Sequence, residues 1–174
     1  MGIININERN YFHSIREAIY QNPIVADGNF VRGVYKMSAE VKMNKRVLVV
    51  EDEPIIALDI RSKLEDAGYQ VTAILSSGEE AVEKVREINP DLILMDIFLG
   101  KNMDGIEATD RILKNNDIPV VFLSANADLN TMKRADATKN YGYLIKPISA
   151  PDLDAIVSIA LERHQFESAA QHHR

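Results

Sequence analysis

The chain contains no cysteine, so it can form neither disulfide bonds nor thiolate metal sites. It also lacks an apolar run of membrane-spanning length, and no charged segment followed by an apolar one opens it. We therefore expect a soluble protein of the cytoplasm. With 174 residues, the chain is long enough for one ordinary domain with a sizeable core.

Signatures of nucleotide-binding and hydrolytic sites are also missing. Neither G-x-x-x-x-G-K-[ST] nor G-x-G-x-x-G occurs, which excludes the two common glycine-rich phosphate-binding loops. The nucleophile pattern G-x-S-x-G of hydrolases is absent too. The sequence therefore indicates none of these enzyme classes.

Basic side chains are outnumbered by acidic ones, and the net charge of −6 is unevenly distributed. Residues 1–43 carry a net charge of +1, which leaves −7 for residues 44–174. An acidic body does not favour the phosphate backbone of nucleic acids, so we expect no direct DNA binding. It is compatible with a small divalent cation.

From residue 45 onward, five apolar segments alternate with five amphipathic ones. This alternation predicts an α/β fold: a doubly wound parallel sheet, covered on both faces, whose ligands bind beyond the carboxyl ends of the strands. The strands are expected at Arg46–Val50, Gln70–Leu75, Asp91–Met95, Val120–Leu123 and Tyr143–Ile145. The helices are expected at Pro54–Ala67, Glu79–Ile88, Ile106–Lys114, Asn130–Thr138 and Pro151–His164.

Three regions follow from this pattern. Residues 1–43 lack the alternation and are too few to bury a core, so we expect an N-terminal extension that is partly helical or disordered. Residues 44–164 are expected to form the folded domain. Residues 165–174 show no periodicity and are expected to be a C-terminal tail.

Four of the predicted strands end in polar residues. These are Glu51 and Asp52 after the first strand, Asp96 after the third, Ser124 after the fourth and Lys146 after the fifth. A carboxylate with apolar flanks is costly unless it is paired, bound to a metal or exposed at the strand's tip. Acids, a hydroxyl and an ammonium group at one edge of a sheet suit a magnesium-dependent phosphoryl acceptor.

Glu51 and Asp52 admit two interpretations. In the first, one of them is the N-cap of the helix that begins at Pro54. In the second, both face Asp96, and a bound Mg²⁺ ion relieves the repulsion between the like charges. Asp52 would then be the direct ligand, and Glu51 would act through water.

Asp96 is the predicted nucleophile, since a carboxylate can attack phosphorus to form an acyl phosphate. Lys146 would neutralise charge on the phosphoryl oxygens, and Ser124 would donate a hydrogen bond to one of them. The bond between Lys146 and Pro147 is a candidate cis peptide bond.

Five segments in order carry a recognisable set of motifs: Val47–Pro54, Leu94–Ile97, Met103–Ile106, Phe122–Ala125 and Tyr143–Pro147. Together they resemble the receiver domain of two-component response regulators. The resemblance spans about residues 45–163. Because no output domain follows residue 164, the chain resembles a stand-alone receiver of the chemotaxis-regulator type.

The resemblance implies a flavodoxin-like, five-stranded sheet of order 2-1-3-4-5, with Mg²⁺ as the cofactor. Asp96 matches the phosphorylated aspartate of the family. Glu51 and Asp52 match its acidic metal-binding pair, with Glu51 as a tolerated variant of the commoner aspartate. The backbone carbonyl of Phe98 would complete the metal shell.

Ser124 and Tyr143 match the family's switch residues, and Lys146 matches its phosphate-contacting lysine. The implied partners are a sensor histidine kinase or phosphotransfer protein and an unidentified downstream protein. The face made by the fourth helix, fifth strand and fifth helix would carry the output, and it could also pair two copies. The only catalysis implied is the protein's own phosphorylation and dephosphorylation.

Two features near the acceptor bear on its surroundings, and the first is a departure from the family pattern. The proline that usually follows soon after the aspartate is missing, and Leu99–Asn102 stands there, which predicts a more flexible loop. In the family, the side chains two positions after the acceptor and after the switch hydroxyl flank the path of the hydrolytic water. Here these are Phe98 and Asn126, and the apolar Phe98 predicts slow self-dephosphorylation.

Two other interpretations stay open. The chain could be a degenerate receiver-like interaction domain that takes no phosphate, or the receiver part of a hybrid sensor kinase. The complete set of acids, hydroxyl and ammonium argues against degeneracy. A hydrolase with an aspartyl-phosphate intermediate would need a D-x-D pattern, whereas Asp96 is followed by Ile97 and Phe98.

Overall fold

In a computed structural model, the chain divides into two compact units, Met1–Met37 and Ser38–Arg174. The structure describes residues 42, 44–100, 102–125 and 129–171. The predicted N-terminal extension lies outside the described residues except for residue 42. No helix in the described ranges is long and apolar enough to cross a membrane.

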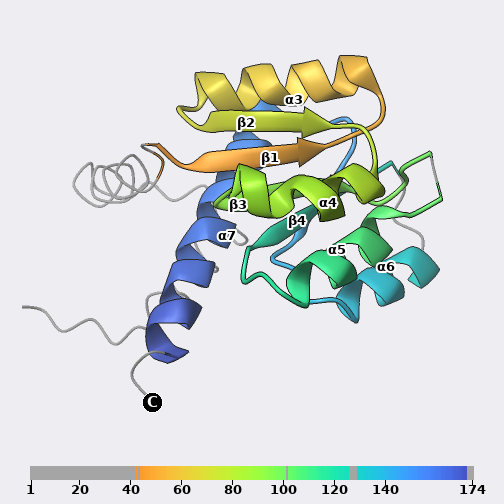
Figure 1. Ribbon diagram of the computed structural model, residues 1–174. Helices are drawn as coiled ribbons and strands as arrows, with labels where there is room; N and C mark the ends of the chain where they lie inside the picture. Colours follow the sequence, from red (N-terminus) through yellow and green to blue (C-terminus); the bar gives the residue numbers. More distant parts are fainter. Residues whose placement is uncertain (1–41, 43, 101, 126–128, 172–174) are drawn as a thin grey trace, which may run out of the picture. The chain divides into compact units, whose positions relative to one another are not determined.

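A parallel sheet of five strands in the order β2-β1-β3-β4-β5 forms the centre of the second unit. The predicted order is confirmed, and Figure 1 shows β1 between β2 and β3. The strands are β1 (Arg46–Val50), β2 (Gln70–Leu75), β3 (Leu92–Asp96), β4 (Val120–Ser124) and β5 (Tyr143–Ile145). Asp96 and Ser124 are thus the last residues of their strands, one position beyond the predicted ends.

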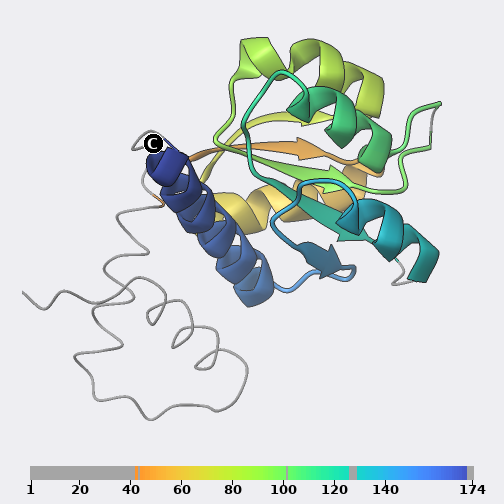
Figure 2. The ribbon, with the colours of Figure 1, turned by 90° about the horizontal axis from the view of Figure 1, so that it is seen from below.

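In the part of the chain that the structure describes, helices cover both faces of the sheet (Figure 2). They are α3 (Pro54–Asp66), α4 (Gly78–Ile88), α5 (Gly105–Leu113), α6 (Leu129–Asp136) and α7 (Ala150–Gln171). Helices α3 and α7 share one core cluster with the sheet, and α4, α5 and α6 share the other. This two-sided burial explains why β3 and β4 are apolar up to their last residues.

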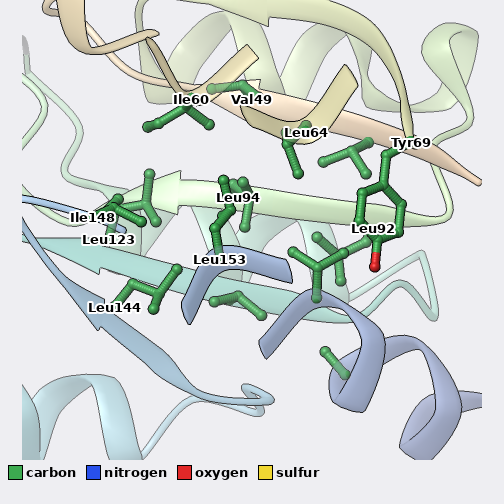
Figure 3. Packing of buried hydrophobic residues seen from close by; sticks show 14 of the residues in the cluster. Val49, Ile60, Leu64, Tyr69, Leu92, Leu94, Leu123, Leu144, Ile148 and Leu153 are labelled. Carbon is green, nitrogen blue, oxygen red and sulfur yellow. The ribbon is translucent and has the colours of Figure 1, made fainter. Parts of the chain in front are cut away.

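Figure 3 shows the cluster beneath α3 and α7. Val49, Leu94 and Leu123 come from three neighbouring strands and are fully buried. Ile60 of α3 and Leu153 of α7 pack against them from the helical side. Each such side chain contributes about 1.5–3 kcal/mol by leaving water, so the core holds the strand ends in fixed register.

Helix α3 begins at its predicted residue, and α4 and α5 begin one residue earlier than predicted. Pro54 opens α3, where its missing N–H costs nothing. Ser77 and Asp104 are the N-caps of α4 and α5, and their side-chain oxygens accept from the amides of Glu80 and Glu107. These caps fix where the helices start relative to the carboxyl edge of the sheet.

Helix α7 continues seven residues beyond His164, the end that we predicted. The expectation of a tail from residue 165 is therefore wrong for residues 165–171, while 172–174 lie outside the described residues. Arg163 and Glu167 form an i,i+4 pair at 2.8 Å, and the hydroxyl of Tyr141 donates to Glu167 at 2.7 Å. These contacts stabilise a segment whose local pattern is too weak to predict a helix.

Candidate functional site

The register of the strands brings the predicted polar residues to one edge. Val50 is paired with Met95, so Glu51 follows β1 beside the place where β3 ends in Asp96. Ser124 is paired with Ile145, and the amide of Lys146 donates to the carbonyl oxygen of Ser124 at 2.8 Å. Residues far apart in the sequence thus meet at the carboxyl edge, as predicted.

Three carboxylates lie together there. Glu51, Asp52 and Asp96 each offer an oxygen atom within 4.8 Å of the others. Glu51 and Asp96 are only 1% and 3% exposed, whereas Asp52 is half-buried. Carboxylate oxygens at this spacing could hold a hard divalent cation, which prefers oxygen ligands.

Lys146 lies between the two buried acids. Its Nζ is 2.7 Å from Oε2 of Glu51 and 2.8 Å from Oδ2 of Asp96. Burial alone disfavours the charged ammonium, but the hydrogen bonds and charges of Asp96 and Glu51 outweigh it and raise the pKa of Lys146. Lys146 therefore stays protonated and can neutralise negative charge at the strand tips.

One ammonium does not compensate three carboxylates. Burial raises the pKa of Glu51, Lys146 opposes that increase, and the charge of Asp96 adds to it. The residues present therefore fit a divalent cation, since an added positive charge beside Asp52 would offset the surplus of negative charge.

Two amides of the loop between β3 and α5 donate to these carboxylates. The amide of Phe98 donates to Oδ1 of Asp96 at 3.0 Å, and the amide of Gly100 donates to Oδ2 of Asp52 at 2.9 Å. Phe98 is 48% exposed, so it lies at the surface, two residues after Asp96, rather than in the core.

The alternative in which Glu51 or Asp52 caps the first helix is wrong. The N-cap of α3 is Glu53, and its side chain makes no capping hydrogen bond. The amide of Glu53 instead donates to Oε1 of Glu51 at 3.2 Å. Both acids are therefore available to the cluster.

Gly105 is a positioning residue that our sequence reasoning did not single out. A Cβ atom at this residue would lie 1.9 Å from the backbone oxygen of Asp96, so only glycine lets α5 begin against the end of β3. The signal was present in the Met103–Ile106 motif, but only the tertiary contact reveals its reason.

The predicted switch residues occupy neighbouring strands. Ser124 is 5% exposed at the end of β4. The hydroxyl of Tyr143 donates to Oδ1 of Asp136 at 2.6 Å and accepts from the side chain of Asn140 at 3.0 Å. Burial and the bond to Asp136 raise the pKa of Tyr143 to about 12. Asn126, predicted to flank the hydrolytic water, lies outside the described residues.

The sheet order and the acidic cluster beyond its carboxyl edge define a flavodoxin-like domain of the α/β class. Residues 47–158 match the family described as the response regulator receiver domain. The chain belongs to this family, whose members act in two-component systems.

Curated relatives agree with this assignment. The chain is 34% identical over 133 residues to the transcriptional regulatory protein PdtaR of Mycobacterium tuberculosis, covering 76% of this chain and 64% of the relative. It is 32% identical over 127 residues to the DNA-binding response regulator MtrA of Mycolicibacterium smegmatis, covering 73% and 55%. The chain thus spans less than two thirds of the length of these relatives.

Solved structures show the same fold. The signal receiver domain of a modulated diguanylate cyclase from Desulfovibrio desulfuricans matches with a TM-score of 0.68 and 34% identity, covering 71% of this chain and 98% of that one. The response regulator PhyR from Brucella abortus matches with a TM-score of 0.69 and 30% identity, covering 86% and 61%.

Proposed function

We propose that the chain is a phosphoacceptor receiver that takes a phosphoryl group on Asp96 in a reaction that requires Mg²⁺. The observation that carries this proposal is the position of Lys146 between Glu51 and Asp96, beside a third carboxylate. A structural ion pair needs one acid, whereas this site gathers three acids and keeps two of them buried.

Asp52 and Asp96 would bind the cation directly, with the backbone carbonyl of Phe98, and Glu51 would act through water. Bound Mg²⁺ would supply positive charge to the phosphoryl oxygens during transfer. Without it, the surplus of negative charge opposes an incoming anion.

In the transfer step, a carboxylate oxygen of Asp96 attacks phosphorus and forms an O–P bond, while the bond from phosphorus to the donor's nitrogen or oxygen breaks. The carboxylate becomes an acyl phosphate, so Lys146 exchanges its partner on Asp96 for a phosphoryl oxygen. The hydroxyl of Ser124 donates to another phosphoryl oxygen. The donor would be a sensor histidine kinase or a phosphotransfer protein.

Phosphorylation would then act as a switch. If Ser124 moves toward the phosphoryl group, the space it leaves favours an inward turn of Tyr143. That turn breaks the bonds of the Tyr143 hydroxyl to Asp136 and Asn140. The change alters the face of α6, β5 and α7, which would contact a downstream protein or a second copy of the chain.

This proposal assigns no substrate other than the protein itself and no direct contact with DNA. A degenerate receiver is disfavoured because the acids, the ammonium and the hydroxyl are all present and at one edge. The proposal applies equally to a receiver that works within a longer protein in the cytoplasm.

Intact-mass measurement after incubation with acetyl phosphate and Mg²⁺ tests the proposal. We expect a mass gain of one phosphoryl group that hydroxylamine removes and EDTA prevents. Asp96→Asn should abolish the gain, and the matched control Asp91→Asn, at the other end of β3, should retain it. Incorporation that persists in Asp96→Asn would place the acceptor elsewhere.

A further inference from the structure

The loop after β3 is tied to the acidic cluster at the stretch where the usual proline is missing. The amide of Gly100 donates to Oδ2 of Asp52 at 2.9 Å and joins two residues 48 positions apart. A proline has no N–H and could not make this bond. The loop that we expected to be more flexible therefore has a hydrogen bond that the family's proline would exclude at this position.

At residue 100 the small size of glycine matters for the close approach to Asp52 rather than for backbone conformation. The left-handed φ values among the described glycines belong to Gly68 and Gly142, so Gly100 adopts a φ open to other residues. A Cβ atom at Gly100 would lie 2.8 Å from Oδ2 of Asp52, closer than real Cβ contacts. Any side chain here would therefore displace the loop or the Asp52 carboxylate.

The acids of the cluster do not all share the same partners. Lys146 contacts Glu51 and Asp96, and the amide of Phe98 also donates to Asp96. Asp52 is the most exposed of the three acids, and the amide that reaches it comes from Gly100. A half-exposed carboxylate otherwise rotates freely, which disperses the ligand geometry that Mg²⁺ requires.

We propose that Gly100 is a positioning residue whose amide orients the Asp52 carboxylate for the cation. The bond occupies Oδ2 and leaves Oδ1 available as a ligand, in the way that metal-binding carboxylates are commonly supported by an outer hydrogen bond. This inference rests on the metal site of the proposed function. It adds the amide of Gly100, acting through Asp52, to the links between the loop that carries Phe98 and the cation.

Calorimetric titration of the full chain with MgCl₂ tests the proposal. Gly100→Pro removes the donor, and Gly100→Ala keeps it but places a methyl group against Asp52. Both variants should bind Mg²⁺ about tenfold more weakly or worse, as expected for loss of an outer hydrogen bond to a ligand. The control variant Asn102→Ala changes the same loop but leaves the Gly100 amide in place. Its Mg²⁺ affinity should equal that of the parent.

Thermal unfolding in EDTA separates positioning from general loss of structure. The melting temperature of Gly100→Ala without metal should stay close to that of the parent, while its Mg²⁺ affinity falls. Affinities within twofold of the parent for both variants, or tighter binding, would overturn the proposal. If Gly100→Pro does not fold, Gly100→Ala decides the question.

A direct measurement follows the amide itself. In a ¹⁵N-glycine-labelled chain, the Gly100 signal is identified by its loss in Gly100→Ala. We expect this amide to be protected from exchange without metal and to remain protected, with a shifted resonance, at saturating Mg²⁺. Rapid hydrogen exchange of this amide, with or without Mg²⁺, would overturn the proposed role of the Gly100 hydrogen bond but not the metal site. Absence of Mg²⁺ binding by the parent would instead overturn the metal site and the inference with it.

Discussion

The two ends of strand β3 carry the same kind of acid in different surroundings. Asp91, just before the strand, accepts from the amide of Arg46 at 2.8 Å and lies 3.4 Å from Nζ of Lys45. Asp96, at the other end, also accepts from a backbone amide and also pairs with a lysine, at 2.8 Å. The partners are alike, but the side chain of Asp91 is 35% exposed and that of Asp96 is 4% exposed.

The contrast shows that an acid with a backbone hydrogen bond and a lysine partner is not by itself the mark of a functional site. At Asp91 one acid meets one lysine in contact with water, and such a pair is worth little. At Asp96 the pairing is incomplete, because Glu51 and Asp52 add charge that Lys146 cannot fully offset. An excess of buried charge lowers the stability of a fold. Such an excess is therefore expected mainly at sites where the charge takes part in binding or reaction.

The largest effect should come from removing the lysine at each end of the strand. Lys146→Met leaves Glu51 and Asp96 buried without their cation and should cost about 3–5 kcal/mol of unfolding free energy. Lys45→Met should cost at most about 1 kcal/mol, since its pair is exposed. Urea unfolding in EDTA measures both. Equal losses would show that burial does not distinguish the two ends.

Metal should stabilise only the carboxyl edge. At roughly a hundredfold excess of Mg²⁺ over its dissociation constant, the gain should be about 2.7 kcal/mol. Asp52→Ala should lose this response and, with repulsion relieved, should melt no lower than the parent in EDTA. Asp91→Ala is the control and should keep the full response. A parent that does not respond to millimolar Mg²⁺ would contradict the metal site.

The exposed aromatic beside Asp96 should control how long the phosphoryl group persists. Phe98 is apolar and cannot orient a water molecule, so Phe98→Asn should speed loss of phosphate. A tenfold change corresponds to about 1.4 kcal/mol in the barrier. Ile55→Asn replaces another exposed apolar residue, 84% exposed on α3, and should not change the decay. A decay that is unchanged or slower in Phe98→Asn refutes the role in shielding.

The smallest effect should be a pH dependence of stability from Glu51. Its pKa is raised by burial and by Asp96, with Lys146 opposing, so the fold favours the protonated form. The contribution is fully present below the ordinary pKa and is lost as the pH rises through the raised value. Metal-free stability should therefore fall over that interval, and Glu51→Gln should flatten the slope.

Saturating Mg²⁺ provides the matched condition for this titration. A cation favours the carboxylate form, so it should weaken or reverse the slope in the parent. Urea unfolding at several pH values, with and without metal, measures it. A slope that Glu51→Gln leaves intact must come from another group.

The sequence by itself determined the fold class and the members of the site. Parallel strands buried on both faces require long apolar runs, so the polar residues that end them, such as Asp96 and Lys146, are conspicuous in the sequence. Strand order came from the resemblance to the family, because apolar periodicity carries no information on which strands are neighbours. The extension of α7 was missed because Tyr141, distant in sequence, supplies its support.

Only the tertiary structure decided how the acids share their partners. Whether Glu51 caps a helix or faces Asp96 depends on where the backbone turns after β1. The close approaches of Gly100 to Asp52 and of Gly105 to Asp96 likewise depend on distances between segments that the chain brings together on folding. The local sequence pattern reflects the preference of each residue for helix, strand or turn. Excess charge and steric fit depend on contacts between distant residues, and these contacts form only when the core holds the strand ends in register.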